Sequence, residues 1–261
     1  MLLQTAATTI ATTAPVFRDW AFWSFVVAAI ALATSLAGPL RRLLKATRLV
    51  LEVHQTIALD HRLGNPQANL YIDLRNTGGR DIRVKAMLIT LTRDGSESKT
   101  IGGQVYFESI NSQQALLLVP FNIKAGESWA HPVKFYALPN RQLDQQVRVD
   151  ISKFKDNILQ KREALDPSVR SSTLVFADDM LVDPFIQLFN KQFFWTPGEY
   201  VIRIDITAEP AKGSLTKSYR FVIYEAEAAE LKKEIETYSC GGGVYFDSDK
   251  HVSIFPPISA I

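Results

Sequence analysis

Two different hydrophobic patterns divide the chain. Residues 20–40 form an unbroken apolar run, WAFWSFVVAAIALATSLAGPL, with Asp19 before it and Arg41 after it. From residue 49 onward, short stretches of alternating apolar and polar residues are separated by turns rich in glycine and proline. The first pattern is typical of a membrane-spanning helix and the second of β-strands. We therefore expect one N-terminal transmembrane helix followed by a mainly β domain.

The apolar run has the length and composition of a membrane span. At roughly 21 residues it would measure about 31 Å as a helix, against a hydrocarbon core of about 30 Å. Its large apolar side chains contribute about −2.5 to −5 kcal/mol toward insertion. The residues assigned to the membrane anchor are Trp20, Trp23, Phe25, Ile30 and Leu36.

A cleaved signal peptide and a buried core helix are the alternatives for this run. A signal peptide has a basic segment before its apolar run, but Arg18 is the only basic residue before Trp20, and Asp19 offsets its charge. The tripeptide Ser35-Leu36-Ala37 still resembles a cleavage site. A core helix normally has a polar face, which this run lacks. We favour an uncleaved anchor, preceded by a flexible N-terminal arm over residues 1–19.

Basic residues after the run predict the orientation of the chain. Arg41, Arg42, Lys45 and Arg48 lie in a juxtamembrane segment over residues 41–48. Because positive charge beside a span stays in the cytoplasm, we expect the N-terminus outside and the C-terminal domain in the cytoplasm. A single cysteine, Cys240, is compatible with a reducing compartment. These basic residues are also candidates for binding lipid headgroups, although setting the topology alone explains them.

Small residues repeat along the apolar run. Ala29, Ala33 and Ala37 are spaced every four residues, which places them on one helix face. Such a stripe allows close packing of helices, so self-association through the span is one hypothesis. Alanine that merely faces lipid is the plainer interpretation.

Alternation along residues 49–224 predicts a β-sandwich. Residues 49–60 read as a first strand, and further strands are expected around 70–75, 82–91, 116–119 and 129–138. A β-hairpin is expected where Tyr200, Ile202 and Ile204 alternate with polar residues before a turn at Lys212-Gly213-Ser214. The phrases DLRNTGGRDIRV, FNIKAGES and WTPGEYVIRI resemble those of immunoglobulin-like β-sandwich modules. This resemblance implies a fold and no activity.

One to three helical insertions interrupt the strands. Residues 140–165 show apolar residues at helical spacing after a capping Asn140, although VRVDI alternates and allows a strand from Gln145. A short helix is expected after Pro184. Residues 225–240 predict an amphipathic helix ended by Gly241, and residues 241–261 form a C-terminal tail with one more candidate strand at Val244–Phe246.

The composition and the motifs argue against several classes of function. A formal net charge of +2 over 261 residues, with basic residues clustered only beside the span, gives no nucleic-acid footprint. Neither a Walker A, HExxH, GxSxG nor CxxC motif occurs. Gly241-Gly242-Gly243 follows a helix and so has no phosphate-loop context. We expect no cofactor.

Scattered polar residues are the remaining candidates for chemistry. Asp247, Asp249 and His251 lie close in sequence and could bind a metal, but a solvated turn explains them better. An acidic trio, Asp178, Asp179 and Asp183, suits the start of a helix. His54, His61 and His131 are scattered along the chain; we interpret His54 as structural and Cys240 as an inert thiol.

A binding role is therefore the leading hypothesis. The chain is expected to be a single-pass, membrane-anchored binding or scaffold protein, not an enzyme. Its β-sandwich would recruit a protein partner at the cytoplasmic face. The alternative is an oligomerising membrane effector whose spans self-associate and whose sandwich acts as a sensor.

Overall fold

The computed structural model describes residues 20–44, 46–112 and 114–261, with residues 39–44 described by their backbone alone. The chain divides into two compact units, residues 1–46 and residues 47–261. The expected N-terminal arm over residues 1–19 lies outside the described residues.

Helix α1, Trp20–Leu44, makes up the first unit. Its window Trp20–Gly38 has a mean hydropathy of 1.8 and is long and apolar enough to cross a membrane. The helix continues four residues past the expected end at Leu40 and runs through Pro39. Proline removes one backbone hydrogen bond without necessarily ending a helix, so the helix extends beyond the apolar run.

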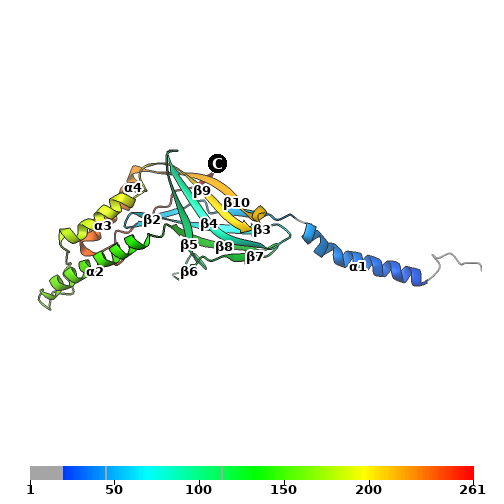
Figure 1. Cartoon of the computed structure of the whole chain (residues 1–261), viewed down its shortest axis with the longest axis horizontal. Coiled ribbons are helices and arrows are strands. Elements are labelled where there is room, and N and C mark those ends of the chain that lie inside the picture. The colour runs from blue at the N-terminus through cyan, green and yellow to red at the C-terminus, as the bar shows by residue number, and fades with distance from the viewer. Residues whose placement is uncertain (1–19, 45, 113) are drawn as a thin grey trace, which may run out of the picture. The chain divides into compact units, whose positions relative to one another are not determined.

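The second unit is mainly β, with an antiparallel sheet whose spatial order is β1-β3-β8-β5-β4-β9-β10-β11. Short strands β2, β6 and β7 pair with β3, β5 and β4. The strands are β1 Leu49–Val53, β2 Ala58–Arg62, β3 Asn65–Asn76, β4 Ile82–Arg93, β5 Glu97–Phe107, β6 Ala115–Leu117, β7 Phe121–Ile123, β8 Ser128–Tyr136, β9 Gly198–Glu209, β10 Leu215–Ile223 and β11 Ser259–Ala260. The hydrogen bonds form one continuous curled sheet (Figure 1).

Curling brings the two ends of the strand order together. Lys217 of β10 donates from Nζ to the carbonyl oxygen of Leu51 on β1 at 2.6 Å. The concave interior is filled by alternating residues of every long strand, as the predicted hairpin illustrates: Tyr200, Ile202 and Ile204 are buried. That hairpin, β9–β10, is confirmed, with a 3-10 turn η2 at Ala211–Gly213.

The expected first strand over residues 49–60 is split into β1 and β2. Between them, His54 Nδ1 accepts a hydrogen bond from the backbone N–H of Thr56 at 3.2 Å, which bends the chain. Thr56 then bridges to Pro257 in the C-terminal segment. The break therefore depends on a partner that is remote in sequence.

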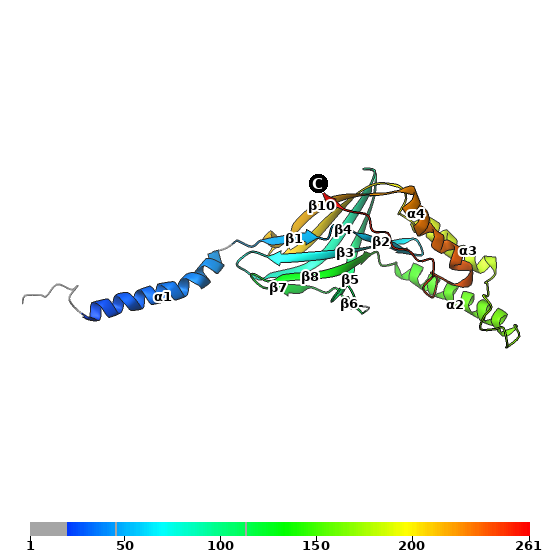
Figure 2. The same cartoon turned by 180° about the vertical axis from the view of Figure 1, so that it is seen from behind.

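Three helices and a 3-10 helix gather at one end of the sheet (Figures 1 and 2). They are α2 Arg141–Glu163, α3 Asp179–Gln192, α4 Glu225–Lys232 and η3 Lys233–Cys240. Residues 145–163 are thus helical, and Asn140 caps α2 by accepting from the Leu143 N–H at 2.7 Å. The helices enclose a second hydrophobic core, which includes Phe154, Phe185 and Phe189.

Two helical boundaries differ from expectation. Helix α3 starts at Asp179 and contains Pro184, whereas a start after Pro184 was predicted. The predicted helix over residues 225–240 is α-helical only to Lys232 and continues as η3, ending at Gly241 with φ of +99°. Val244–Phe246 form no strand: Val244 and Tyr245 lie in a turn, and Phe246 makes an isolated bridge with Gly242.

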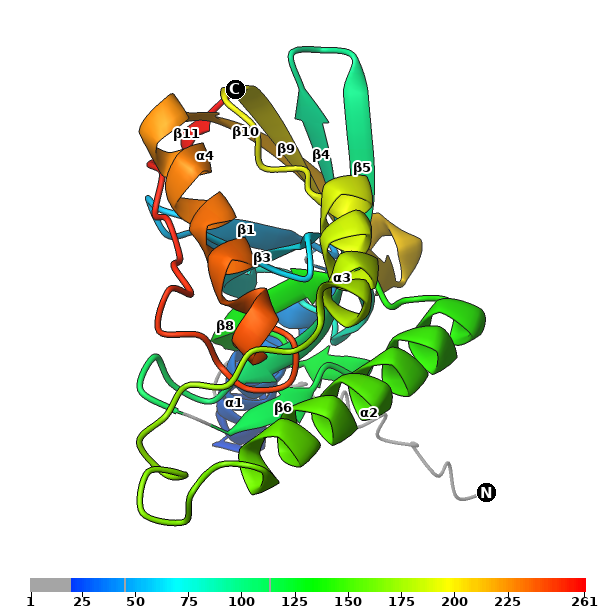
Figure 3. The same ribbon diagram turned by 90° about the vertical axis from the view of Figure 1, so that its left-hand side faces the viewer.

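Residues 241–261 are integrated into the domain rather than forming a free tail. Strand β11 pairs with β10 (Figure 3). Ile254 pairs with Leu59 of β2. The predicted boundary at residue 241 therefore does not separate an independent segment.

Candidate functional site

The most polar part of the interior lies where the β2–β3 turn enters the helical layer. Gly64 occupies this turn with φ of +81°, and a Cβ there would lie 2.5 Å from the carbonyl oxygen of Phe189. Only glycine permits both the backbone angle and the close approach to α3. The turn thereby places His61 against the aromatic rings of Phe189 and Phe193, at centroid distances of 5.1 and 5.5 Å.

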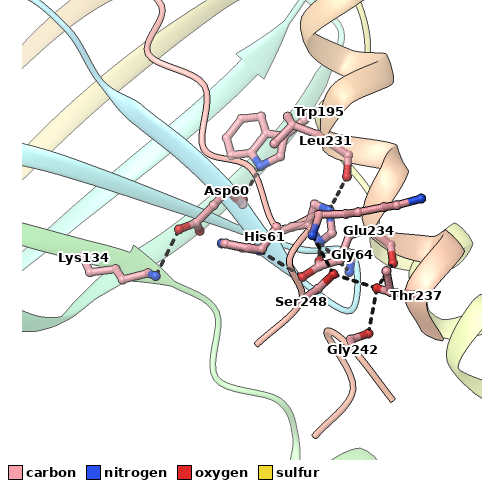
Figure 4. Close-up of polar contacts among 12 residues, drawn as sticks. Asp60, His61, Gly64, Lys134, Trp195, Leu231, Glu234, Thr237, Gly242 and Ser248 are labelled. Atoms are coloured by element: carbon pink, nitrogen blue, oxygen red, sulfur yellow. Dashed lines mark hydrogen bonds and ion pairs between the residues drawn. The ribbon is translucent and has the colours of Figure 1, made fainter. Parts of the chain in front are cut away.

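Glu234 is the buried acid at the centre of this region (Figure 4). Only 4% of its surface is exposed. Its Oε1 lies 3.0 Å from His251 Nδ1, and its Oε2 lies 3.3 Å from His61 Nδ1. A Cβ at Gly243, where φ is +75°, would lie 2.9 Å from the carboxyl carbon of Glu234. The glycine run therefore lets the backbone pass close to this carboxyl group.

His61 is held as a neutral imidazole. Its Nε2 lies 2.7 Å from the carbonyl oxygen of Leu231, so Nε2 carries the proton, and the Gly64 N–H points to Nδ1 at 3.4 Å. Burial lowers the pKa of His61, which outweighs the opposing effects of the Leu231 carbonyl and Glu234. The contact between Nδ1 and Glu234 Oε2 is therefore not an ion pair at neutral pH.

The pKa of His251 shifts in the direction opposite to that of His61. Its hydrogen bond to the Glu234 carboxylate raises the pKa of His251, and partial burial only partly opposes this effect. His251 is more exposed than His61, with 38% of its side chain accessible, so its proton can exchange with solvent. The two histidines thus favour different protonation states beside one carboxylate.

Further polar groups surround the pair. Asp60 accepts from Lys134 Nζ at 3.1 Å, and its carbonyl oxygen accepts from Trp195 Nε1 at 2.6 Å. Glu234 Oε2, Asp60 Oδ1 and the Tyr238 hydroxyl are buried without a hydrogen-bond partner in the described structure. Burial, followed by the charge of Glu234, raises the pKa of Tyr238. Buried polar groups without a hydrogen-bond partner cost free energy, so these groups reduce the stability of the folded domain.

This arrangement can hold and redistribute protons. Among the residues that the structure describes, no three His, Cys, Asp or Glu side chains are arranged to hold a metal ion. The cluster joins β2, η3 and the C-terminal segment, so a change in its protonation acts on three segments at once.

The predicted anchor residues are exposed along α1. Trp20 is 85% exposed, Phe25 71% and Ile30 59%, and Trp23 and Leu36 are also exposed. Ala29, Ala33 and Ala37 are exposed as well. Lys45 and the side chains of Arg41 and Arg42 lie outside the described residues. Arg48 is exposed, and its carbonyl oxygen accepts from the Thr77 N–H at 3.0 Å.

The acidic candidates do not converge on a common site. His251 bonds Glu234 rather than joining Asp247 and Asp249 in a metal site. Asp178 lies 2.6 Å from Lys161 Nζ and accepts from Asn157, and these two partners lower the pKa of Asp178. Asp179 begins α3, at the helix start where acidic residues were expected.

The remaining candidates make local contacts. His54 contacts Thr56, and His131 Nδ1 lies 3.2 Å from the carbonyl oxygen of Phe107. The free thiol of Cys240 donates to the carbonyl oxygen of Thr237 at 3.1 Å.

Sequence reasoning missed Glu234 as the central residue. It lies in a charged helix, EAEAAELKKEIETY, where a solvent-facing role is the ordinary expectation. The available signal was Gly241-Gly242-Gly243, because consecutive glycines mark places where backbone approaches other groups closely.

Comparisons with known proteins leave the family open. Neither a family model nor a curated protein matches the chain. Among solved structures, the sporulation control protein Spo0M from Bacillus subtilis is similar, with 11% identity and a TM-score of 0.27. The match covers 74% of this chain and 54% of that one, so the chain spans about half the length of that structure. We derive neither fold nor function from a likeness this distant.

Proposed function

We propose that the chain is a single-pass membrane protein whose β domain recruits a protein partner at the cytoplasmic face. The observation that carries the proposal is α1, whose 19-residue window Trp20–Gly38 is apolar enough to span a bilayer. At about 1.5 Å per residue this window measures about 28 Å, close to the hydrocarbon thickness. Leaving so many exposed apolar side chains in water would be unfavourable, and lipid removes that cost.

The proposed topology follows from charge. Arg41, Arg42 and Lys45 follow the apolar window, whereas Arg18 precedes it beside Asp19. These basic residues would hold the C-terminal side in the cytoplasm, where they can also contact anionic headgroups. We propose that the anchor is retained rather than cleaved.

The finer fold proposal is an immunoglobulin-like packing of the curled sheet. Antiparallel pairing of the named strands and a core built from alternating residues support it. Such β modules commonly act as binding domains, although fold alone assigns no partner.

A candidate recruiting surface lies on residues 169–180, which connect α2 to α3 and include the first turn of α3. Apolar side chains stay exposed there within twelve residues: Val169 44%, Leu174 61%, Phe176 51% and Met180 82%. Exposed apolar residues gathered on one segment commonly mark protein-binding surfaces. No catalytic role is proposed, and the buried Glu234 cluster is instead assigned to the domain's own conformation.

Affinity capture from mild detergent tests the recruiting role. The full chain carrying Phe176→Lys and Met180→Lys should lose a partner that the unchanged chain retains, because lysine charge opposes apolar docking. Ile110→Lys, which alters a residue 80% exposed outside this segment, is the matched control and should retain the partner. A monodisperse chain without any partner would contradict the proposal.

The alternative is a membrane effector that assembles through its spans. Ala29, Ala33 and Ala37 would form the packing face. Replacing Ala33 with isoleucine should then reduce the oligomer size in detergent, whereas Ala31→Ile should not. An unchanged oligomer size in Ala33→Ile would exclude this alternative.

A further inference from the structure

The C-terminal segment, residues 254–261, lies between residues 55–59 and strand β10 and connects them by backbone pairing. On one side it pairs with residues 55–59, and on the other with β10. The backbone N–O contacts to residues 55–59 are Leu59–Ile254 at 2.9 Å, Ile254–Leu59 at 3.0 Å, Ile57–Pro256 at 3.2 Å and Ile258–Gln55 at 2.8 Å. Ile261 N–H then donates to the Ser218 carbonyl oxygen at 3.2 Å. Displacing the segment would leave backbone groups on both sides unpaired.

Side chains just before this segment bind it to η3. His251 bonds Glu234, Lys250 pairs with Glu236, and Ser248 Oγ lies 2.8 Å from Thr237 Oγ1. The Lys250–Glu236 pair is exposed and so contributes little. Glu234 is the buried partner, so its contact with His251 is the strongest candidate for holding the segment in place.

The same carboxylate faces β2. Glu234 Oε2 lies 3.3 Å from His61 Nδ1 and has no hydrogen-bond partner, because His61 presents an unprotonated nitrogen. One buried carboxylate is therefore shared between His251, just before the C-terminal segment, and His61 on β2.

We propose that His61, Glu234 and His251 form a proton-controlled latch for the C-terminal segment, residues 254–261. The latch is closed when His251 is protonated and His61 is neutral. Loss of the His251 proton weakens its bond to Glu234. A second proton on His61 places an extra charge among Phe189 and Phe193 and displaces the Gly64 N–H from Nδ1.

The two histidines set opposite limits on the closed state. The raised pKa of His251 means that its contribution is fully present below about pH 6.5 and is lost as pH rises through its folded pKa. The lowered pKa of His61 means that its contribution is present above about pH 6.5 and is lost as pH falls through its folded pKa. The segment is therefore held best between these limits and released on either side.

Other charged groups facing the cluster modulate these limits. Asp60 on β2 favours the protonated form of both histidines, and Lys134 on β8 opposes protonation of His251. The charge of Glu234 raises the pKa of both histidines, and the charge of His251 opposes protonation of His61. Tyr238 on η3 stays protonated because its pKa is raised, and Glu236 stays ionised because Lys250 lowers its pKa. The histidines therefore remain the groups that titrate near neutral pH.

Hydrogen exchange of the full chain in mild detergent tests the latch between pH 5 and pH 9. After correction for intrinsic exchange rates, the peptide covering residues 254–261 should be most protected near neutral pH. Its protection should fall at least about threefold toward both extremes. The β9 peptide, residues 198–209, should keep its protection, since the rest of the domain stays folded.

Three variants separate the two limits. His251→Gln should lose the alkaline fall and keep the acid fall, and His61→Gln should do the reverse. His131→Gln is the matched control, because His131 on β8 contacts the carbonyl oxygen of Phe107 on β5, so both falls should remain. If the buried His61→Gln change prevents folding, His251→Gln alone decides. A flat wild-type profile, an alkaline fall retained in His251→Gln, or a parallel fall in β9 would overturn the proposal.

Discussion

Gly64 lets the β2–β3 turn approach the backbone of α3 more closely than a side chain would allow. Its φ of +81° and a Cβ position 2.5 Å from the Phe189 carbonyl oxygen make glycine necessary there. The same turn positions His61 between two phenylalanine rings. A local backbone requirement therefore determines the geometry of the polar cluster.

Replacing Gly64 with alanine should destabilise the chain by about 2–5 kcal/mol, through backbone strain together with steric overlap. The measurement is urea unfolding of the full chain in mild detergent, followed by tryptophan fluorescence. Gly95→Ala is the control, because Gly95 also has positive φ, at +70°, but has no atom within 4 Å of its Cβ position. Equal losses in the two variants would refute the close-approach argument.

Tyr238 supplies a second test at this scale. Its hydroxyl is buried without a partner, so Tyr238→Phe removes an unsatisfied group while keeping the ring. The free energy of unfolding should stay the same or rise by up to about 2 kcal/mol. A loss of more than about 1 kcal/mol would mean that the hydroxyl makes a stabilising bond. Tyr200→Phe is the contrasting variant and should destabilise, because its hydroxyl donates to the Phe194 carbonyl oxygen at 2.9 Å.

At the scale of elements, local signals predicted the long regular segments well. The alternation of residues in β9–β10 and the capping of α2 by Asn140 involve residues close together in sequence. The hairpin and the helix both form as expected. The split of residues 49–60 into β1 and β2 was missed because Thr56 pairs with Pro257, some 200 residues away. The start of α3 was misplaced because Pro184 was taken as a boundary.

Pro184 should therefore limit the stability of α3. It lies inside the helix on an exposed face and leaves the Met180 carbonyl oxygen without its usual backbone donor. Pro184→Ala should raise the free energy of unfolding by about 1–3 kcal/mol. Calorimetry of the full chain measures this change, with Asp183→Ala as the neighbouring exposed control. Destabilisation by Pro184→Ala would show that the proline is needed to shape α3.

At the scale of the whole molecule, sequence analysis identified the two parts but not how the second is held together. The apolar run and the β alternation are properties of contiguous residues. The cluster of His61, Glu234 and His251 joins positions separated by up to about 190 residues, so no local pattern indicates it. The continuous curled sheet likewise depends on strand pairings that spacing alone does not specify.

The anchor should fail when a charge is placed at its centre. Ile30→Arg adds about 3–4 kcal/mol to the cost of insertion, comparable with the gain that the whole run supplies. The chain should then lose most of its membrane association in flotation assays, whereas Ile30→Leu should float like the unchanged chain. Full flotation of Ile30→Arg would indicate that another part of the chain binds the membrane.

Labelling of single cysteines tests the central claim, a retained anchor with the β domain in the cytoplasm. Cys240 is half-buried and bonded to Thr237, so Cys240→Ser removes it, and Ser96→Cys places a reporter on the exposed β4–β5 turn. Thr8→Cys reports on the N-terminal side of the anchor. We predict that a membrane-impermeant maleimide labels Thr8→Cys in intact cells, and labels Ser96→Cys only after permeabilisation. Labelling of Ser96→Cys in intact cells, or recovery of a shortened soluble chain, would contradict the account.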